Sequence, residues 1–98
     1  MKTLDISHNN LISLKGIELI PNLENIFVNY NPLEDISDLK DLKHLEFIRA
    51  SKESIPQRYH HFLYKNGDII GRQIVEKLQL FLKLELELKK DNRYNLLI

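Results

Sequence analysis

Residues 23–33 read Leu-Glu-Asn-Ile-Phe-Val-Asn-Tyr-Asn-Pro-Leu and contain the most regular pattern in the chain. Four apolar residues and one asparagine in it follow one another in steps of three, two, three and two residues: Leu23, Ile26, Val28, Asn31 and Leu33. The same places are filled 22 residues earlier by Met1, Leu4, Ile6, Leu11 and Asn9. They are filled again 22 residues later, less regularly, by Leu45, Ile48, Ala50, Ile55 and Glu53. The sequence therefore repeats with a period of 22 residues.

The segments between these motifs repeat as well. Apolar residues recur there at every third position, first as Leu14, Ile17 and Ile20 and then as Ile36, Leu39 and Leu42. This spacing favours a short helical return, closer to 3₁₀ than to α, with one edge turned inward. The pair Asn31 and Pro32 predicts a sharp turn directly after the central motif.

The motif and its period resemble the 22-residue class of leucine-rich repeat proteins, and the resemblance covers residues 1–55. It implies an α/β fold, a short right-handed solenoid whose parallel strands line the concave side. Two full repeats and a partial third would be followed by residues 56–98, a mostly helical C-terminal cap with a Leu-rich tail. Asn9 and Asn31 occupy the ladder position, where a buried amide is expected to bond backbone groups of the turn that leaves each strand.

The first repeat unit starts at Met1, so its apolar side chains are expected to be open on one side. Repeat units bury their apolar faces only against neighbouring units. Three alternatives follow: the chain is a piece of a longer array, two copies close against each other, or this end is frayed.

Composition excludes several classes of function. The chain has 98 residues, of which 43% are hydrophobic and 29% are charged, and this predicts one folded domain. A formal net charge of +0 argues against bulk attraction to nucleic acid or to an anionic membrane. The sequence has no cysteine, which excludes disulfides and thiolate metal sites and is compatible with a reducing compartment. We therefore expect a cytoplasmic protein with no cofactor, no nucleic-acid partner and no membrane partner.

The Leu-rich tail carries two conflicting signals. From residue 78 to residue 88 leucine alternates with other residues, which is the period of a strand. Leu, Glu, Lys and Gln are nevertheless strong helix formers, and no β-branched residue follows Val75 before residue 90. We favour a helix with two leucine stripes on opposite sides, one of Leu78, Leu82 and Leu86 and one of Leu80, Leu84 and Leu88. The second stripe would then need a partner.

Two groups of residues invite a catalytic or metal-binding interpretation. Asp5, Ser7 and His8 supply hydrolase residue types, but no glycine-rich loop or nucleophile elbow accompanies them. His60 and His61 are adjacent and lack the spacing of metal ligands. We expect surface residues in both cases, and therefore neither an enzyme nor a metal site.

The strand pleat predicts a binding surface instead. Residues between the leucine positions should point to the concave side and stack in columns, one of Asp5, Phe27 and Arg49 and another of His8, Tyr30 and Lys52. Exposed aromatic residues beside arginine are typical of protein-binding hot spots. We expect a protein partner here, with these residues as its contacts: Asp5, His8, Phe27, Asn29, Tyr30, Arg49 and Lys52. The alternative function is structural, a segment that assembles with itself or with a larger subunit through the Leu-rich tail, with a homodimer as one form.

Overall fold

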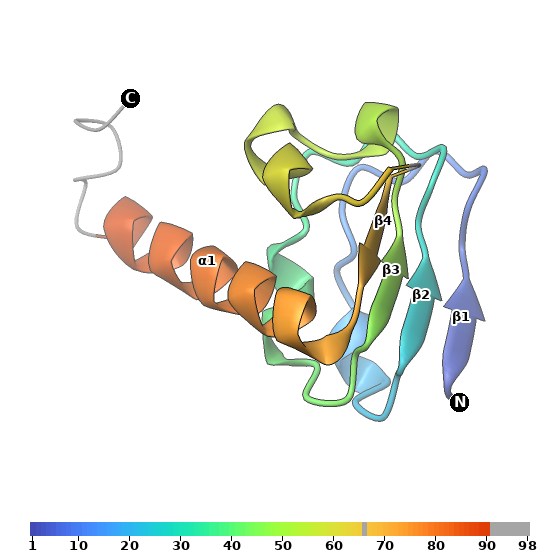
Figure 1. Cartoon of the computed structure of the whole chain (residues 1–98), viewed down its shortest axis with the longest axis horizontal. Helices are drawn as coiled ribbons and strands as arrows, with labels where there is room; N and C mark the ends of the chain where they lie inside the picture. The colour runs from blue at the N-terminus through green and yellow to red at the C-terminus, as the bar shows by residue number, and fades with distance from the viewer. Residues whose placement is uncertain (66, 91–98) are drawn as a thin grey trace.

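A computed structural model of the chain describes residues 1–65 and 67–90, and Figure 1 shows the arrangement of its elements. The four strands are β1 (Thr3–Asp5), β2 (Asn25–Phe27), β3 (Phe47–Arg49) and β4 (Asp68–Ile70). Four 3₁₀ helices connect them: η1 (Ile17–Leu19), η2 (Ser37–Asp41), η3 (Lys52–Ser54) and η4 (Gln57–Phe62). One α-helix, α1 (Arg72–Lys90), ends the described part of the chain.

The strands form one sheet in the order β1-β2-β3-β4. The first three strands are parallel, and their register follows the sequence period, since Thr3 pairs with Asn25 and Asn25 with Phe47. β4 runs antiparallel to β3, with Ile70 opposite Phe47. The sheet is therefore mixed.

The predicted solenoid is wrong. The chain forms a small compact α/β domain with a four-stranded mixed sheet and one long helix, and a sheet of four strands is too small for a repeat solenoid. The reason lies in the segment after the third motif. η4 and the turn at Gly67 bring the chain back along β3, so that a reversed strand takes the edge where another parallel strand would stack. The region expected to be a mostly helical cap thus contributes a strand to the main sheet.

The core lies between one face of the sheet and the return segments. The middle residue of each of β2, β3 and β4 is buried, and the two residues beside it are more exposed, as the strand pleat requires. The buried middle residues are Ile26, Ile48 and Ile69. Towards β1 the core is less complete, because Leu4, Ile6 and Leu11 are only partly buried.

Helix α1 packs on η2, β4 and η4, and its C-terminal part projects away from the sheet (Figure 1). The tail is thus helical, as predicted, over Arg72–Lys90; residues 91–98 of the predicted tail lie outside the described residues. Val75, Leu78 and Leu82 are fully buried on the inner face of this helix. Within residues 1–65 and 67–90, no helix is both long and apolar enough to cross a bilayer.

Two buried polar side chains fix α1 in place. Gln79 donates from Nε2 to the backbone oxygens of Leu39 and Leu42, at 2.9 and 2.8 Å. Glu85 accepts the Tyr59 hydroxyl at one carboxylate oxygen and the Arg58 Nε–H at the other, both at 2.6 Å. Both groups are satisfied inside the domain, so they orient the helix without leaving an unpaired polar atom.

Candidate functional site

The face of the sheet opposite the core is open, and two rows of side chains cross it. The strand register aligns Thr3, Asn25, Phe47 and Ile70 in the first row. It aligns Asp5, Phe27, Arg49 and Asp68 in the second. We call this surface the open face. Because these residues flank the middle position of each strand, which faces the core, the pleat turns them away from the core.

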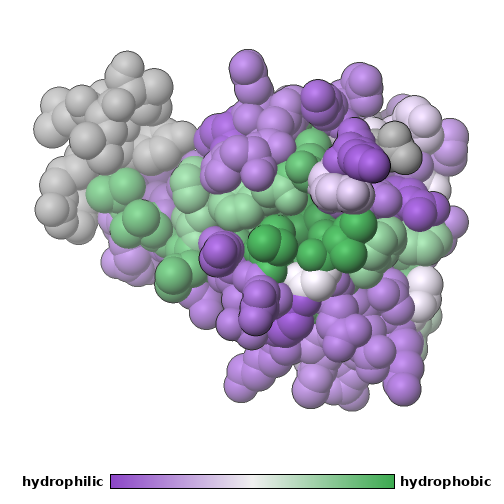
Figure 2. Space-filling model, in the orientation of Figure 1, coloured by the Kyte–Doolittle hydropathy of each residue, from purple (hydrophilic) through white to green (hydrophobic). Residues whose placement is uncertain are grey.

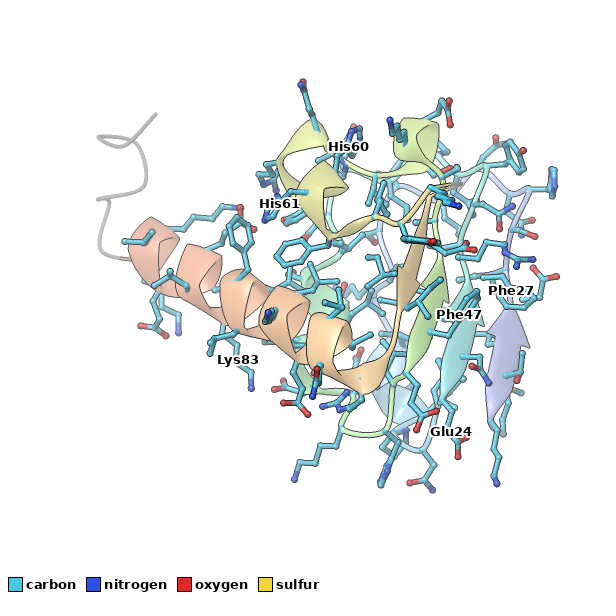
Figure 3. The ribbon with its side chains drawn as sticks, in the orientation of Figure 1. Glu24, Phe27, Phe47, His60, His61 and Lys83 are labelled. Atoms are coloured by element: carbon cyan, nitrogen blue, oxygen red, sulfur yellow. The ribbon has the colours of Figure 1, made fainter. Side chains whose placement is uncertain are left out.

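An aromatic and charged group occupies the centre of the open face. The Arg49 guanidinium lies over the rings of Phe27 and Phe47, 5.1 and 5.5 Å from their centroids. The two rings meet edge to face with centroids 6.0 Å apart (Figure 3). Arg49 also donates from Nε to Asp68 Oδ1 at 3.3 Å. We call Phe27, Phe47, Arg49 and Asp68 the Phe–Arg cluster.

The Phe–Arg cluster is held firmly but remains accessible. The Arg49 side chain is 50% exposed, whereas the side chain of Asp68 is only 18% exposed. Contacts to two rings and one carboxylate restrict the long arginine side chain before any partner arrives, which lowers the entropy lost on binding.

A residue with a positive φ angle follows each of the three parallel strands. His8, Tyr30 and Ser51 all have positive φ angles, of 59°, 62° and 63°, which turn the chain sharply out of the sheet. The rings of His8 and Tyr30 stack with centroids 4.4 Å apart. The Tyr30 backbone N–H donates to Ser54 Oγ at 2.5 Å. A stacked aromatic pair therefore borders the open face, with Tyr30 58% exposed.

A small hollow lies between this pair and the Phe–Arg cluster. It has a volume of about 180 Å³ and is lined by Asn29, Tyr30, Arg49, Ser51 and Asp68. The side-chain oxygen of Asn29 is itself buried, and no donor from the described residues reaches it. The hollow is therefore lined mainly by polar and charged side chains of the open face and its border.

The residues suggestive of a hydrolase are arranged differently from a catalytic set. The Ser7 hydroxyl donates to Asp5 Oδ1 at 2.5 Å, and the Ser7 backbone N–H donates to the same oxygen at 3.0 Å. These bonds, the hydroxyl first, lower the pKa of the Asp5 carboxyl. The His8 ring stacks on Tyr30. The hydroxyl is thus directed at a carboxylate, whereas a nucleophilic serine is bonded to its base.

The adjacent histidines have separate contacts on η4 (Figure 3). A ring nitrogen of His60 lies 3.0 Å from the Ile55 backbone oxygen, and the His61 ring lies against Phe62. Over the described ranges, no three His, Cys, Asp or Glu side chains gather closely enough to hold a metal ion.

Six of the seven predicted contact residues lie on the open face or at its border. The exception is Lys52, which is the first residue of η3 and has already left the line of β3. Sequence reasoning did not find Asp68 and Ile70, which β4 adds to the two rows. The one signal for them in the sequence is the Asn-Gly pair before them, which favours a tight turn that could join two short strands or two helical turns; Asn66 lies outside the described residues.

No protein-family model matches this sequence, and no curated protein or solved structure matches it either. The function of the open face is therefore inferred from its own chemistry.

Proposed function

We propose that the protein is a non-enzymatic interaction module that binds a protein partner through the open face. The observation that carries this proposal is the Phe–Arg cluster. Phe27 and Phe47 are partly exposed, and aromatic rings beside a pre-positioned arginine are the composition of energetic hot spots at protein interfaces.

The surroundings of the cluster support the same function. Ile70 is 47% exposed at the edge of the first row, so the face offers apolar area beside the charged centre. The hollow next to Arg49, lined by polar side chains and Tyr30, would accept one polar side chain of the partner. An apolar centre with a few fixed polar groups gives both affinity and orientation.

The test begins with capture of partners by the intact chain and their identification by mass spectrometry. The affinity of a purified partner is then measured for the double variant Phe27→Ala, Arg49→Ala. We expect a loss of about 2 kcal/mol or more, roughly thirtyfold, because a hot spot is truncated. The control is Leu19→Ala on η1, an apolar residue with 81% exposure outside the open face.

Unchanged affinity of the double variant, with its far-UV circular dichroism and melting temperature intact, would contradict the proposal. Equal losses for the double variant and for Leu19→Ala would contradict it too, since the effect would not then belong to the open face.

A further inference from the structure

Helix α1 has an apolar row that faces solvent. Leu80 and Leu84 are 70% and 58% exposed, whereas Leu78 and Leu82 are fully buried. At 100° per residue, the exposed row lies roughly 180° from the buried one. In Figure 2 hydrophobic surface continues from the body of the domain along the projecting helix. Two exposed leucines one turn apart form an apolar surface, and no other part of residues 1–65 and 67–90 covers it.

The residues around these leucines follow the spacing of a helix-pairing surface. Steps of four and three residues connect the members of one outer row, which we call the outer seam: Gln73, Lys77, Leu80, Leu84 and Glu87. This is the alternation at which one helix packs along another. The two leucines lie at the centre of the seam, with the cation Lys77 towards its N-terminal end and the anion Glu87 towards its C-terminal end.

We propose that two copies of the chain pair through the outer seams of α1 in antiparallel orientation. With a two-fold axis beside residue 82, Leu80 packs on the partner's Leu84 and Leu84 on the partner's Leu80. The same axis places Lys77 opposite the partner's Glu87, and Glu87 opposite the partner's Lys77. A two-fold interface must be complementary to itself, and this arrangement of charges meets that requirement.

The charges also decide against parallel pairing. A parallel pair would place Lys77 against the partner's Lys77 and Glu87 against the partner's Glu87, two repulsive contacts in place of two attractive ones. Within the chain, Glu87 already lies 3.6 Å from Lys90, with side-chain exposures of 67% and 73%. Exposed pairs of this kind contribute little, so Glu87 can exchange that contact for one across the interface.

A further row beside the seam favours the same orientation. Ile74, Phe81 and Leu88 are partly exposed along one edge of the helix. In the antiparallel pair, Phe81 meets the partner's Phe81 near the axis, and Ile74 meets the partner's Leu88. The apolar contact is thus longer than two leucines, but it still involves a single helix from each copy. We therefore expect association that depends on concentration, as for small interfaces generally.

The outer seam and the open face share no residue, so either can fail without the other. The test is sedimentation equilibrium of the full chain from low micromolar to near-millimolar concentration. We expect the apparent mass to rise towards twice that of the chain. The double variant Leu80→Lys, Leu84→Lys should remain a monomer throughout, whereas Leu19→Lys, at an even more exposed leucine on η1, should associate as the parent chain does.

Charge reversal tests the orientation. Lys77→Glu alone, or Glu87→Lys alone, places like charges at both ends of the interface and should weaken association about tenfold. The two reversals combined restore opposite charges and should restore the parent affinity. A parent chain that stays monomeric near millimolar concentration would overturn the proposal. So would single reversals without effect, or a combined variant no tighter than the single ones, in folded protein.

Discussion

The side-chain oxygen of Asn31 accepts the backbone N–H of Asn9 at 3.0 Å, although the two residues are 22 positions apart. The same oxygen accepts the Leu11 N–H, and the Asn31 amide donates to the backbone oxygens of Ile6 and Val28. Asn31 thus ties together the chain segments that leave two neighbouring strands, from a position only 2% exposed. The side chain of Asn9, by contrast, is exposed and bonds backbone oxygens of its own turn.

The first prediction compares these two asparagines. Asn31→Ala should lower the free energy of unfolding by about 1–3 kcal/mol, because buried backbone groups lose their partners. Asn9→Ala should cost under about 1 kcal/mol, since water can replace its exposed bonds. Urea titration of both variants measures the difference. Equal and negligible losses would show that the Asn31 bonds do not stabilise the fold.

The repeat in the sequence anticipates the register of three strands but not the fold. Residues with the same role recur after one period, so Ile26 and Ile48 lie side by side in the sheet. β4 has no such recurrence. A strand of three residues is too short to show an alternating pattern in the sequence. Its position opposite β3 depends on contacts between distant parts of the chain. The 22-residue period thus shows which residues of the three parallel strands lie side by side. It does not show that an antiparallel strand, β4, takes the edge of the sheet.

The sequence likewise predicts some residues of the candidate site and not others. Phe27 and Arg49 alternate with core residues, and this placed them on the open face from the sequence alone. The partner of Arg49 was not predictable, because Asp68 lies 19 residues further on in the segment without a repeat. Nor does a sequence show that Ser51 adopts the positive φ that directs Lys52 away from β3.

The second prediction compares two glycines with nearly the same φ angle, Gly16 at +102° and Gly67 at +99°. A Cβ on Gly16 would meet nothing within 4 Å, so Gly16→Ala should cost only the strain of positive φ, about 1–2 kcal/mol. A Cβ on Gly67 would lie 2.4 Å from the Cα of Ser51. Gly67→Ala should therefore force the main chains apart and cost more than about 4 kcal/mol.

Gly67 also connects the turn to the sheet, since its backbone oxygen accepts the N–H groups of Ala50 and Ser51, both at 3.0 Å. Chemical denaturation measures the loss of stability in Gly67→Ala. We expect amide hydrogen exchange to show that protection is lost around β3 and β4 first. Similar stability of the two glycine variants would contradict the close approach of Gly67 to Ser51.

The third prediction concerns the contribution of α1 to the core. Leu82 is 0% exposed and Leu19 is 81% exposed, so one substitution can be compared at two opposite degrees of burial. Leu82→Ala should cost about 2–5 kcal/mol through lost burial and a cavity. Leu19→Ala should stay within about 0.5 kcal/mol of the parent chain. Denaturation midpoints at one protein concentration measure both. A Leu82→Ala midpoint as high as that of Leu19→Ala would mean that α1 does not pack on the sheet.

The fourth prediction concerns pH. Burial raises the pKa of the Tyr59 hydroxyl above its ordinary value, and the neighbouring Glu85 carboxylate, which accepts its hydrogen bond, raises it further. Below about pH 10 the hydroxyl is protonated in both the folded and the unfolded state, so it adds no pH dependence. Above about pH 10 the unfolded chain releases this proton while the folded chain retains it. Rising pH therefore favours unfolding, by up to about 1.4 kcal/mol per pH unit.

Tyr59→Phe should remove this slope, although it also lowers stability at neutral pH by about 1–3 kcal/mol because Glu85 loses a donor. The measurement is the free energy of unfolding of parent and variant at about pH 9 and about pH 11, where ordinary tyrosines begin to ionise. Every other residue is the same in the two proteins, so the difference between them isolates the Tyr59 hydroxyl. Tyr64→Phe is the matched control, because Tyr64 is 57% exposed and should leave the parent slope unchanged. If Tyr59→Phe retained the full alkaline slope, the buried hydroxyl would not be its source.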